Sequence, residues 1–159
     1  MTDKKILLIT PEFPPQHGGI ARYLQMIAEH LHDQIEVLTQ PHSDWQVSDS
    51  LASYPVYRQQ LLFTYVWPAW LKIVGYLFRF RSRYRLVLVS HVLPYGTAAL
   101  LAQWLTRIPY IVFLHGMDVH LATQSGWKRM LMRIVLRRAR LVVSNSQSLA
   151  QEVAGQTGL

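Results

Sequence analysis

The fold of this chain is decided by the stretch ILLITPEFPPQHGGIARYLQMIAEHL, residues 6–31. It opens with a short apolar run, continues as a loop rich in proline and glycine, and ends in a segment whose apolar residues recur at helical spacing: Ile20, Tyr23, Leu24, Ile27 and Leu31. This pattern predicts a buried strand, a loop and an amphipathic helix. Because the prolines exclude helix, the turn into the helix falls on Gly18-Gly19.

The glycine turn has properties that suit an anionic ligand. Glycines accept unusual backbone dihedrals and let a ligand approach the main chain closely. The first amides of a helix have no partner within it, and the helix dipole favours negative charge beside them. A phosphate-bearing ligand at Gly18-Gly19 is one interpretation, and a simple structural turn is the other. The stretch matches neither the dinucleotide-binding G-x-G-x-x-G motif nor a Walker loop.

Composition narrows the class of protein. A chain of 159 residues with 50% hydrophobic content predicts one globular domain with a real core. The absence of cysteine excludes disulfides and thiolate metal sites, and suits a reducing compartment. The net charge of +7 is unevenly placed: residues 1–71 carry four Lys/Arg against seven Asp/Glu, whereas residues 72–140 carry twelve against one. This asymmetry indicates an anionic partner, which could be phosphate groups, nucleic acid or a membrane surface.

Strand and helix patterns alternate along the rest of the chain. Further strands are predicted at 35–39, 54–58, 86–89, 109–114 and 141–143, and further helices at 68–81, 97–106, 126–138 and beyond Ser146, with a polar loop at 41–50. This rhythm is typical of an α/β fold with a Rossmann-like, doubly wound parallel sheet.

Three predicted strands end in chemically distinctive loops, at residues 14–19, at Ser90-His91 and at 115–118. Parallel strands present their carboxyl ends at one edge of the sheet, where such folds bind ligands. We therefore expect the three loops to converge on one crevice, with His91 and Tyr95 as candidates for contacting an acceptor. The alternative for His91 is a histidine that only forms hydrogen bonds within its loop.

The apolar segment 61–80 raises the question of a membrane. Two charges, a proline and a glycine argue against a transmembrane span. One interpretation is a core helix with cations at its C-terminus. The other is a helix that docks on an anionic membrane surface, with a second basic stripe, Arg129, Arg133 and Arg137, joining it if the fold allows. The membrane-facing candidates are Trp70, Lys72, Arg79, Arg81 and Arg83.

Four motifs, in this order along the chain, resemble a known family: the strand at residues 5–10, Pro14-Pro15 with Gly18-Gly19, His115-Gly116-x-Asp118-Val119, and residues 143–146. Together they are similar to the N-terminal domain of GT-B-fold retaining glycosyltransferases, the group 1 or family 4 enzymes. The resemblance covers nearly the whole chain. It implies that residues 1–159 form the N-terminal, acceptor-side domain, the N-terminal half of a GT-B fold.

The resemblance also implies roles for particular residues. Gly18-Gly19 would face the donor diphosphate or the acceptor, and Asp118 would hold the loop that carries His115. His115 would contact the transferred sugar through its side chain and its main-chain carbonyl. The donor would be a nucleotide-diphosphate sugar and the acceptor a lipid-linked molecule or a glycan. Neither a metal ion nor a cofactor is expected.

By the same resemblance, the protein would act in cell-envelope polysaccharide synthesis, either free in the cytoplasm or peripheral on the inner face of the cell membrane. The family holds its nucleotide in a second domain, between two glutamates at a fixed spacing. None of the pairs formed by the four glutamates of this chain has that spacing. We therefore expect residues 1–159 to be truncated before the nucleotide-binding domain and to be inactive alone.

Three alternatives remain at the level of sequence. A catalytically silent domain that binds sugars or docks on membranes would show the same residues. Another α/β enzyme of nucleotide sugars, such as an epimerase, shares the strand–loop–helix start. A nucleic-acid-binding module would explain the basic stretch, but the aromatic residues lack a β-sheet platform, so no nucleic acid is expected as a partner.

Overall fold

The computed structural model describes residues 4–123 and 125–158, without the side chains of Asp118 and Leu121. All neighbouring strands pair in parallel, in one sheet of order β3-β2-β1-β4-β5-β6. The predicted Rossmann-like, doubly wound sheet is confirmed. The strands are β1 (Lys5–Thr10), β2 (Ile35–Thr39), β3 (Val56–Arg58), β4 (Tyr84–Val89), β5 (Tyr110–Leu114) and β6 (Leu141–Ser144).

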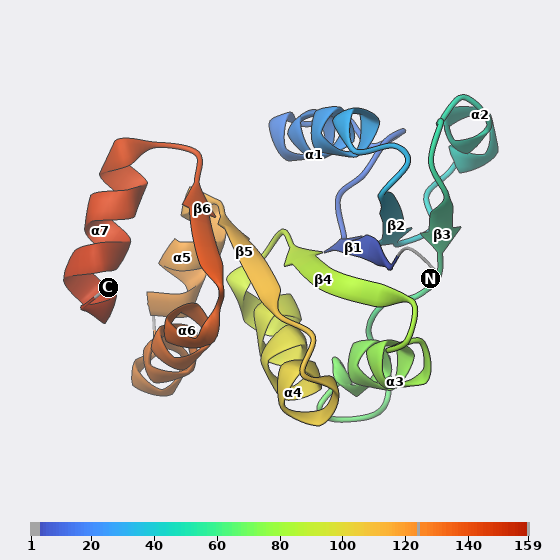
Figure 1. Ribbon diagram of the computed structural model, residues 1–159. Coiled ribbons are helices and arrows are strands. Elements are labelled where there is room, and N and C mark those ends of the chain that lie inside the picture. The colour runs from blue at the N-terminus through green and yellow to red at the C-terminus, as the bar shows by residue number, and fades with distance from the viewer. Residues whose placement is uncertain (1–3, 124, 159) are drawn as a thin grey trace.

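Helices lie on both faces of the sheet. Figure 1 shows α1 and α2 above it and α3, α4 and α6 below it, with α7 at one side. The helical elements are α1 (Gly19–His30), α2 (Trp45–Ser50), α3 (Leu71–Arg79), the π-helical turn η1 (Val92–Gly96), α4 (Thr97–Thr106), α5 (Gly116–Thr123), α6 (Gly126–Arg138) and α7 (Gln147–Thr157).

Each face of the sheet has its own core. Because side chains alternate along a strand, consecutive residues of β1 supply opposite clusters. Ile6 and Leu8 join the cluster that contains Leu24 and Ala28 of α1. Leu7 and Ile9 join the larger cluster, which takes residues from α3, α4, α5, α6 and α7. The central strands are thus apolar on both faces, which explains their unbroken runs of hydrophobic residues.

The structure departs from the predicted elements in three places. Residues 45–50, predicted as part of a loop, form α2, and residues 116–118, also predicted as loop, begin α5 directly after β5. The third helix starts at Leu71 rather than at Pro68, because tight turns precede it: the Leu71 amide donates to the Pro68 carbonyl and the Ile73 amide to the Trp70 carbonyl. None of the helices in the described part of the chain is long and apolar enough to cross a membrane.

A buried carboxylate organises the end of the sheet opposite the crevice. Glu36 of β2 is 3% exposed and accepts from Arg83 at 2.6 and 3.0 Å and from the Tyr84 hydroxyl at 2.9 Å. Arg83 also donates to the Tyr57 hydroxyl at 2.6 Å, and the Tyr76 and Tyr84 hydroxyls are 3.2 Å apart. Hydrogen bonding to Glu36 raises the pKa of Arg83, and burial raises that of Tyr84. Arg83 therefore serves the fold.

This network gives a stability prediction. Arg83→Met leaves the Glu36 carboxylate buried without its cation, so we expect the free energy of unfolding to fall by about 3 kcal/mol. Arg81→Met is the matched control, because Arg81 is exposed and donates only to the Phe78 carbonyl at 3.1 Å; its effect should stay within about 0.5 kcal/mol. Urea unfolding measures both. Equal stabilities for the two variants would contradict the structural role of Arg83.

Candidate functional site

The sheet order reverses between β1 and β4, since the chain continues from β1 to β2 on one side and from β4 to β5 on the other. Folds of this class bind ligands at the carboxyl ends of strands at such a point. Two buried hydroxyls meet at this point of the sheet: Ser90, just after β4, donates to Thr10, the last residue of β1, at 2.9 Å. The strand ends are thereby fixed relative to each other.

A chain of hydrogen bonds that starts at Thr10 and Ser90 determines the tautomer of His91. The Thr10 hydroxyl donates to the Glu12 carbonyl at 2.9 Å, so its oxygen accepts from Ser90. With the Ser90 proton used in this way, the Ser90 oxygen accepts from Nδ1 of His91 at 2.8 Å. A neutral His91 then carries its proton on Nδ1 and an unprotonated Nε2. That nitrogen lies 3.5 Å from a Glu12 carboxylate oxygen and can accept a hydrogen bond from a hydroxyl.

Two histidines lie together at this edge of the sheet. The rings of His91 and His115 lie 5.7 Å apart between centroids, and His115 is 6% exposed. Burial lowers the pKa of His91; burial and then the neighbouring His91 lower that of His115, against a smaller opposing effect of Glu12. Both rings are therefore neutral at pH 7. A histidine with a depressed pKa stabilises the fold above its ordinary pKa of about 6.5, and this stabilisation is lost as the pH falls through the folded-state pKa.

Tyr95 lies beside His91 but is occupied within the protein. Its side chain is 4% exposed, its ring centroid is 5.9 Å from that of His91, and its hydroxyl accepts from Gln40 at 3.2 Å. Burial raises the pKa of the phenol. Tyr95 thus lies next to His91, and its hydroxyl is bonded to Gln40; its contact with an acceptor stays a prediction.

His115 follows β5 and starts α5. Its main-chain carbonyl accepts from the Val119 amide at 3.3 Å, which makes it part of the first helical turn. One lone pair of this carbonyl oxygen is therefore used within the protein, and its contact with a transferred sugar stays a prediction, as does that of the His115 side chain. The side chain of Asp118 lies outside the described part of the structure.

Gly18 and Gly19 border an open hollow at the start of α1. The hollow has a volume of about 620 Å³ and is lined by the proline loop, both glycines, Arg22 and Gln25. A Cβ atom at either glycine would meet nothing within 4 Å. The backbone at Gly18 is extended, with φ 162°. The sequence analysis pointed to unusual backbone dihedrals as one property of glycine here, and Gly18 does not have them. What the glycines supply is open space beside the first amides of α1.

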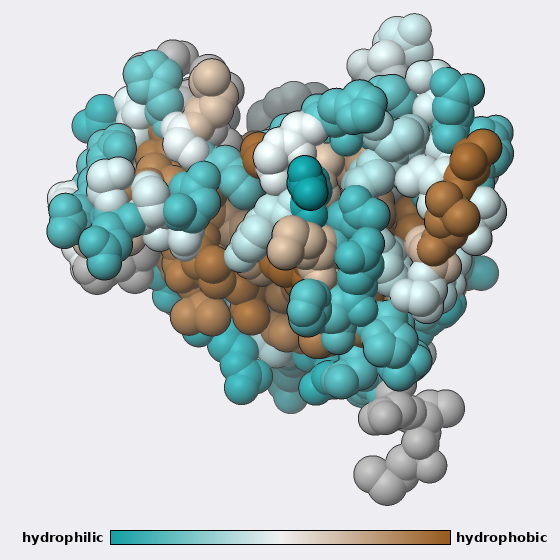
Figure 2. All heavy atoms as spheres, turned by 90° about the horizontal axis from the view of Figure 1, so that it is seen from above, coloured by the Kyte–Doolittle hydropathy of each residue, from teal (hydrophilic) through white to brown (hydrophobic). Residues whose placement is uncertain are grey.

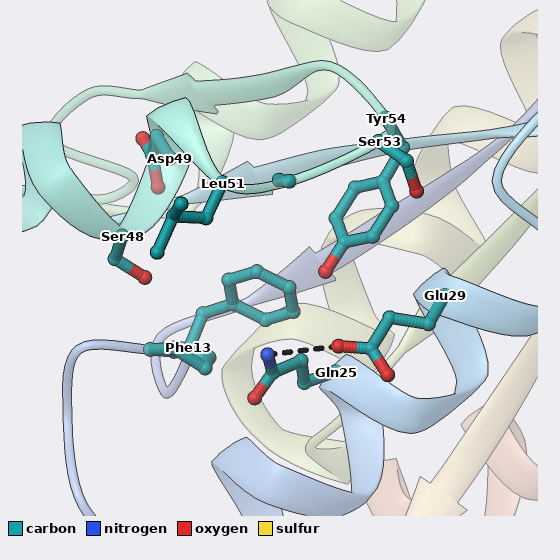
Figure 3. Close-up of a pocket in the computed structure, with 10 residues that line it drawn as sticks. Phe13, Gln25, Glu29, Ser48, Asp49, Leu51, Ser53 and Tyr54 are labelled. Atoms are coloured by element: carbon teal, nitrogen blue, oxygen red, sulfur yellow. Dashed lines mark hydrogen bonds between the residues drawn. The ribbon is translucent and has the colours of Figure 1, made fainter.

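A second cavity, of about 300 Å³, lies on the other side of the proline loop (Figure 3). The rings of Phe13 and Tyr54 pack edge to face within its wall, with centroids 6.3 Å apart, and Gln25 donates to Glu29 at 2.9 Å. Burial, followed by the nearby Glu29 and Asp49 carboxylates, raises the pKa of Tyr54 to about 12. Pro14 of the proline loop and Gln25 of α1 line both cavities, so the two cavities adjoin there.

The proline loop is anchored by a buried arginine. Arg58, the last residue of β3, donates to both carboxylate oxygens of Asp49 at 2.8 Å, to the Gln40 carbonyl at 3.1 Å and to the Pro14 carbonyl. Its side chain is 3% exposed. One guanidinium therefore ties β3, α2 and the loop that shapes the crevice together.

The membrane-facing candidates divide into two groups. Arg79, Arg81 and Arg83 are exposed, and Arg83 is also bound to Glu36; Trp70 is half-buried against the core, and Lys72 is half-buried. Arg83 and Trp70 thus have contacts within the fold, and the membrane-facing role of all five residues stays a prediction. The second basic stripe also forms hydrogen bonds within the protein. Arg129, Arg133 and Arg137 donate to the carbonyls of Thr123, Gln156 and Thr157 respectively.

Sequence reasoning missed three contributors to the site, Thr10, Glu12 and Arg58, and it named Ser90 only as part of a strand-end loop. Glu12 could have been found, because a carboxylate within a proline loop after a buried strand is placed at the crevice by the loop itself. Thr10 and Ser90 carry a weaker signal, a hydroxyl at the end of each of two apolar strands. Arg58 carries none, since its partners come from three separate segments.

Comparison with known proteins identifies the protein family. The family model described as a glycosyl transferase 4-like domain matches residues 18–158, and the chain belongs to that family. The predicted resemblance to the N-terminal domain of GT-B glycosyltransferases is confirmed. A search of curated proteins finds no match.

Solved structures share the fold. The chain is similar to Anabaena Alr3699/HepE in complex with UDP and glucose (TM-score 0.73, 18% identity, covering 96% of this chain and 41% of that one). It is also similar to the same protein with UDP (TM-score 0.69, 23% identity, 97% and 41%) and with UDP-glucose (TM-score 0.71, 22% identity, 97% and 40%). The chain thus spans about 41% of the length of the HepE chains it matches.

Proposed function

We propose that this chain is the N-terminal, acceptor-side domain of a glycosyltransferase that moves a sugar from a nucleotide-diphosphate donor to a hydroxyl acceptor with retention. The observation that carries the proposal is the pairing, at the carboxyl edge of the sheet, of His91 after β4 and His115 after β5, with rings 5.7 Å apart. The open start of α1, in the same proline–glycine loop as Glu12, adds a place for a diphosphate.

In this proposal the departing diphosphate lies against the first amides of α1. Negative charge develops on the phosphate oxygen as its bond to the anomeric carbon breaks, and fixed amide dipoles stabilise that charge without reorganising. Arg22 lines the same hollow and adds a positive charge. HepE, a structural neighbour, has been solved with UDP and with UDP-glucose, which supports a donor of this chemical class.

His115 and His91 serve the two reacting sugars in different ways. Neutral His115 donates a hydrogen bond to a hydroxyl of the transferred sugar. The unprotonated Nε2 of His91 accepts one from the acceptor and orients it, with Glu12 beside it. The acceptor oxygen bonds to the anomeric carbon on the face that the diphosphate leaves, and the acceptor proton passes to a diphosphate oxygen. Configuration is retained and no protein nucleophile is required.

The proposal also includes a second domain, the acceptor and the place where the acceptor is bound. A second domain supplies the rest of the nucleotide pocket. The acceptor is a lipid-linked molecule or a glycan of the cell envelope, reached from the inner face of the membrane. The basic middle of the chain, with twelve Lys/Arg against one acidic residue over 72–140, supports an anionic surface as a partner.

The test compares the chain alone with the complete two-domain enzyme. Each is incubated with UDP-glucose or GDP-mannose and a lipid extract as acceptor, and release of the nucleoside diphosphate is followed. We expect multiple turnovers only from the complete enzyme, and a product whose anomeric proton coupling matches that of the donor. Multiple turnovers by the chain alone would contradict the division into two domains, and an inverted product would contradict retention.

A further inference from the structure

The second cavity, beside the proline loop, contains a buried hydroxyl group without a partner. Tyr54 is 6% exposed, and its hydroxyl forms no hydrogen bond with any residue that the structure describes. Figure 3 shows this hydroxyl pointing into the cavity, toward the Glu29 carboxylate and beside the Phe13 ring. Because an unpaired polar group in a buried position costs free energy, a ligand that bonds to it is favoured.

Further polar groups surround the cavity. Besides Tyr54, its lining contains the Gln25 amide, the Glu29 carboxylate and the Ser48 and Ser53 hydroxyls. Gln25 donates to one carboxylate oxygen of Glu29 at 2.9 Å, which holds both side chains in place on α1. This bond uses one of the two amide hydrogens and one of the two carboxylate oxygens, so each group can still bond to a ligand. The cavity therefore offers both donors and acceptors.

A hydroxyl group fits between Tyr54 and Glu29 better than an ion does. The phenol is protonated and donates, because burial, followed by the nearby carboxylates, raises its pKa to about 12. A hydroxyl can accept from the phenol and donate to the carboxylate at once, whereas an ammonium group only donates and a carboxylate only accepts. A metal ion lacks ligands: both oxygens of Asp49 accept from Arg58 at 2.8 Å, and no cluster of three or more metal-binding side chains occurs among the described residues.

The size and the charge of the cavity narrow the ligand further. Its volume of about 300 Å³ is at the lower end of the range for ligand pockets, which suits a single ring with several hydroxyls, such as a sugar unit. Among its lining residues Glu29 and Asp49 are acidic and none is basic, so a carboxylate or phosphate on the ring would be repelled. The adjoining hollow, which contains Arg22, has the opposite preference.

We propose that the second cavity binds one sugar unit that carries hydroxyl groups and no anionic group. This inference rests on the proposed function, because it makes the acceptor a glycan whose neighbouring unit lies in this cavity. Phe13 of the lining directly follows Glu12, whose carboxylate lies 3.5 Å from Nε2 of His91. A unit bound here therefore lies along the same loop as the groups that orient the acceptor hydroxyl.

NMR titration of the isotope-labelled chain, without any donor, tests the site. The probes are the methyl glycosides of glucose, mannose and galactose. We expect at least one of them to bind and to shift the amide signals of Phe13 and Tyr54. Tyr54→Phe removes only the hydroxyl and should weaken this binding about fivefold. Tyr65→Phe is the matched control, because Tyr65 is 97% exposed and outside the cavity; it should bind like the parent.

The hydroxyl of Tyr54 has no partner among the described residues, so Tyr54→Phe should keep the thermal midpoint of the parent. A loss of sugar binding in this variant is then a loss of the contact and not of the fold. Failure of the parent to bind any of the three glycosides would overturn the proposal. So would equal affinities for Tyr54→Phe and the parent.

The charge of the cavity is tested with the uronates of the same three sugars. The parent should not bind them, and Glu29→Gln should bind the uronate of the sugar that the parent prefers, because the repulsion is removed while the shape is kept. Glu152→Gln is the control: Glu152 of α7 accepts from Gln156 at 3.3 Å, a similar pair outside the cavity. It should exclude uronates as the parent does. Uronate binding by the parent, or exclusion by Glu29→Gln, would contradict the choice of ligand.

Kinetics of the complete enzyme separate this site from the transfer reaction. Tyr54→Phe should raise KM for a glycan acceptor about fivefold, with the loss in KM rather than in kcat, because the contact is made equally before and during the reaction. If sugars bind but no transfer occurs, the proposed function fails and the site stands. If transfer occurs and Tyr54→Phe keeps the parental KM and sugar affinity, the site fails and the proposed function stands.

Discussion

Replacing His115 by alanine in the complete enzyme is expected to lower turnover by about 10²–10³-fold, the usual loss when one preorganised donor is removed from a reacting centre. His115 is 6% exposed and its ring lies beside His91 at the carboxyl end of β5. In the proposed function it hydrogen-bonds the transferred sugar as its anomeric carbon becomes cationic, so the effect should appear in kcat more than in KM for the donor.

The control is His120→Ala, an exposed histidine one helical turn further along α5. It should match the parent in kcat. Because His115→Ala leaves a small cavity, His115→Gln is measured beside it: the amide keeps a donor and fills most of the space, so it should recover part of the rate. Parental kinetics for His115→Ala, or equal losses at positions 115 and 120, would remove His115 from the reaction.

The second large effect is expected at Gly19. Gly19→Val should lower turnover by about 10²–10³-fold while leaving the fold intact. The intact fold and the loss of turnover are expected for different reasons. An added Cβ meets nothing within 4 Å, so the folded chain has room for it. The same side chain occupies the space through which a diphosphate reaches the first amides of α1, so charge on the leaving group loses its stabilisation.

Gly155→Val provides the matched substitution. Gly155 also lies in a helix, α7, it is exposed, and its added Cβ also meets nothing within 4 Å. Thermal unfolding should show similar midpoints for the two variants, and only Gly19→Val should raise KM for the donor and lower kcat. Unchanged kinetics in Gly19→Val would mean that the glycine turn faces neither the donor nor the acceptor.

The sequence was sufficient for the class of sheet and for the edge at which a ligand is expected. Each central strand is apolar on both faces and is followed by a helix pattern, so a doubly wound parallel sheet with its ligand edge at the carboxyl ends follows from general rules; the strand order was not predicted. Gly18-Gly19, His91 and His115 are found in this way because each stands directly after or near a strand end. Helix α5 was missed because its start depends on the Val119 amide bonding to the His115 carbonyl, which no periodicity reports.

The role of charged residues was less predictable. The cluster of arginines after α3 looks uniform in sequence, yet Arg83 is bound to a buried glutamate 47 residues away and Arg81 lies over a neighbouring ring. Only the spatial pairing of β2 with β1, and of β1 with β4, brings Glu36 to Arg83. Likewise, Tyr65 and Trp67 were read as part of an apolar segment, because sequence alone does not tell a protruding turn from a core helix.

The hydrogen bond between Ser90 and Thr10 also has a consequence for how the protein folds. These residues are neighbours in the sheet but 80 positions apart in the sequence. During synthesis β1 can pair with β2 early, while its other edge waits until β4 has emerged. Closing so long a loop is slow, and the unpaired apolar edge is exposed to aggregation in the meantime. The edge of the sheet that carries Thr10 and Ser90 is therefore among the later parts to form, and amides of β1 on the β4 side should gain protection from hydrogen exchange later than those facing β2.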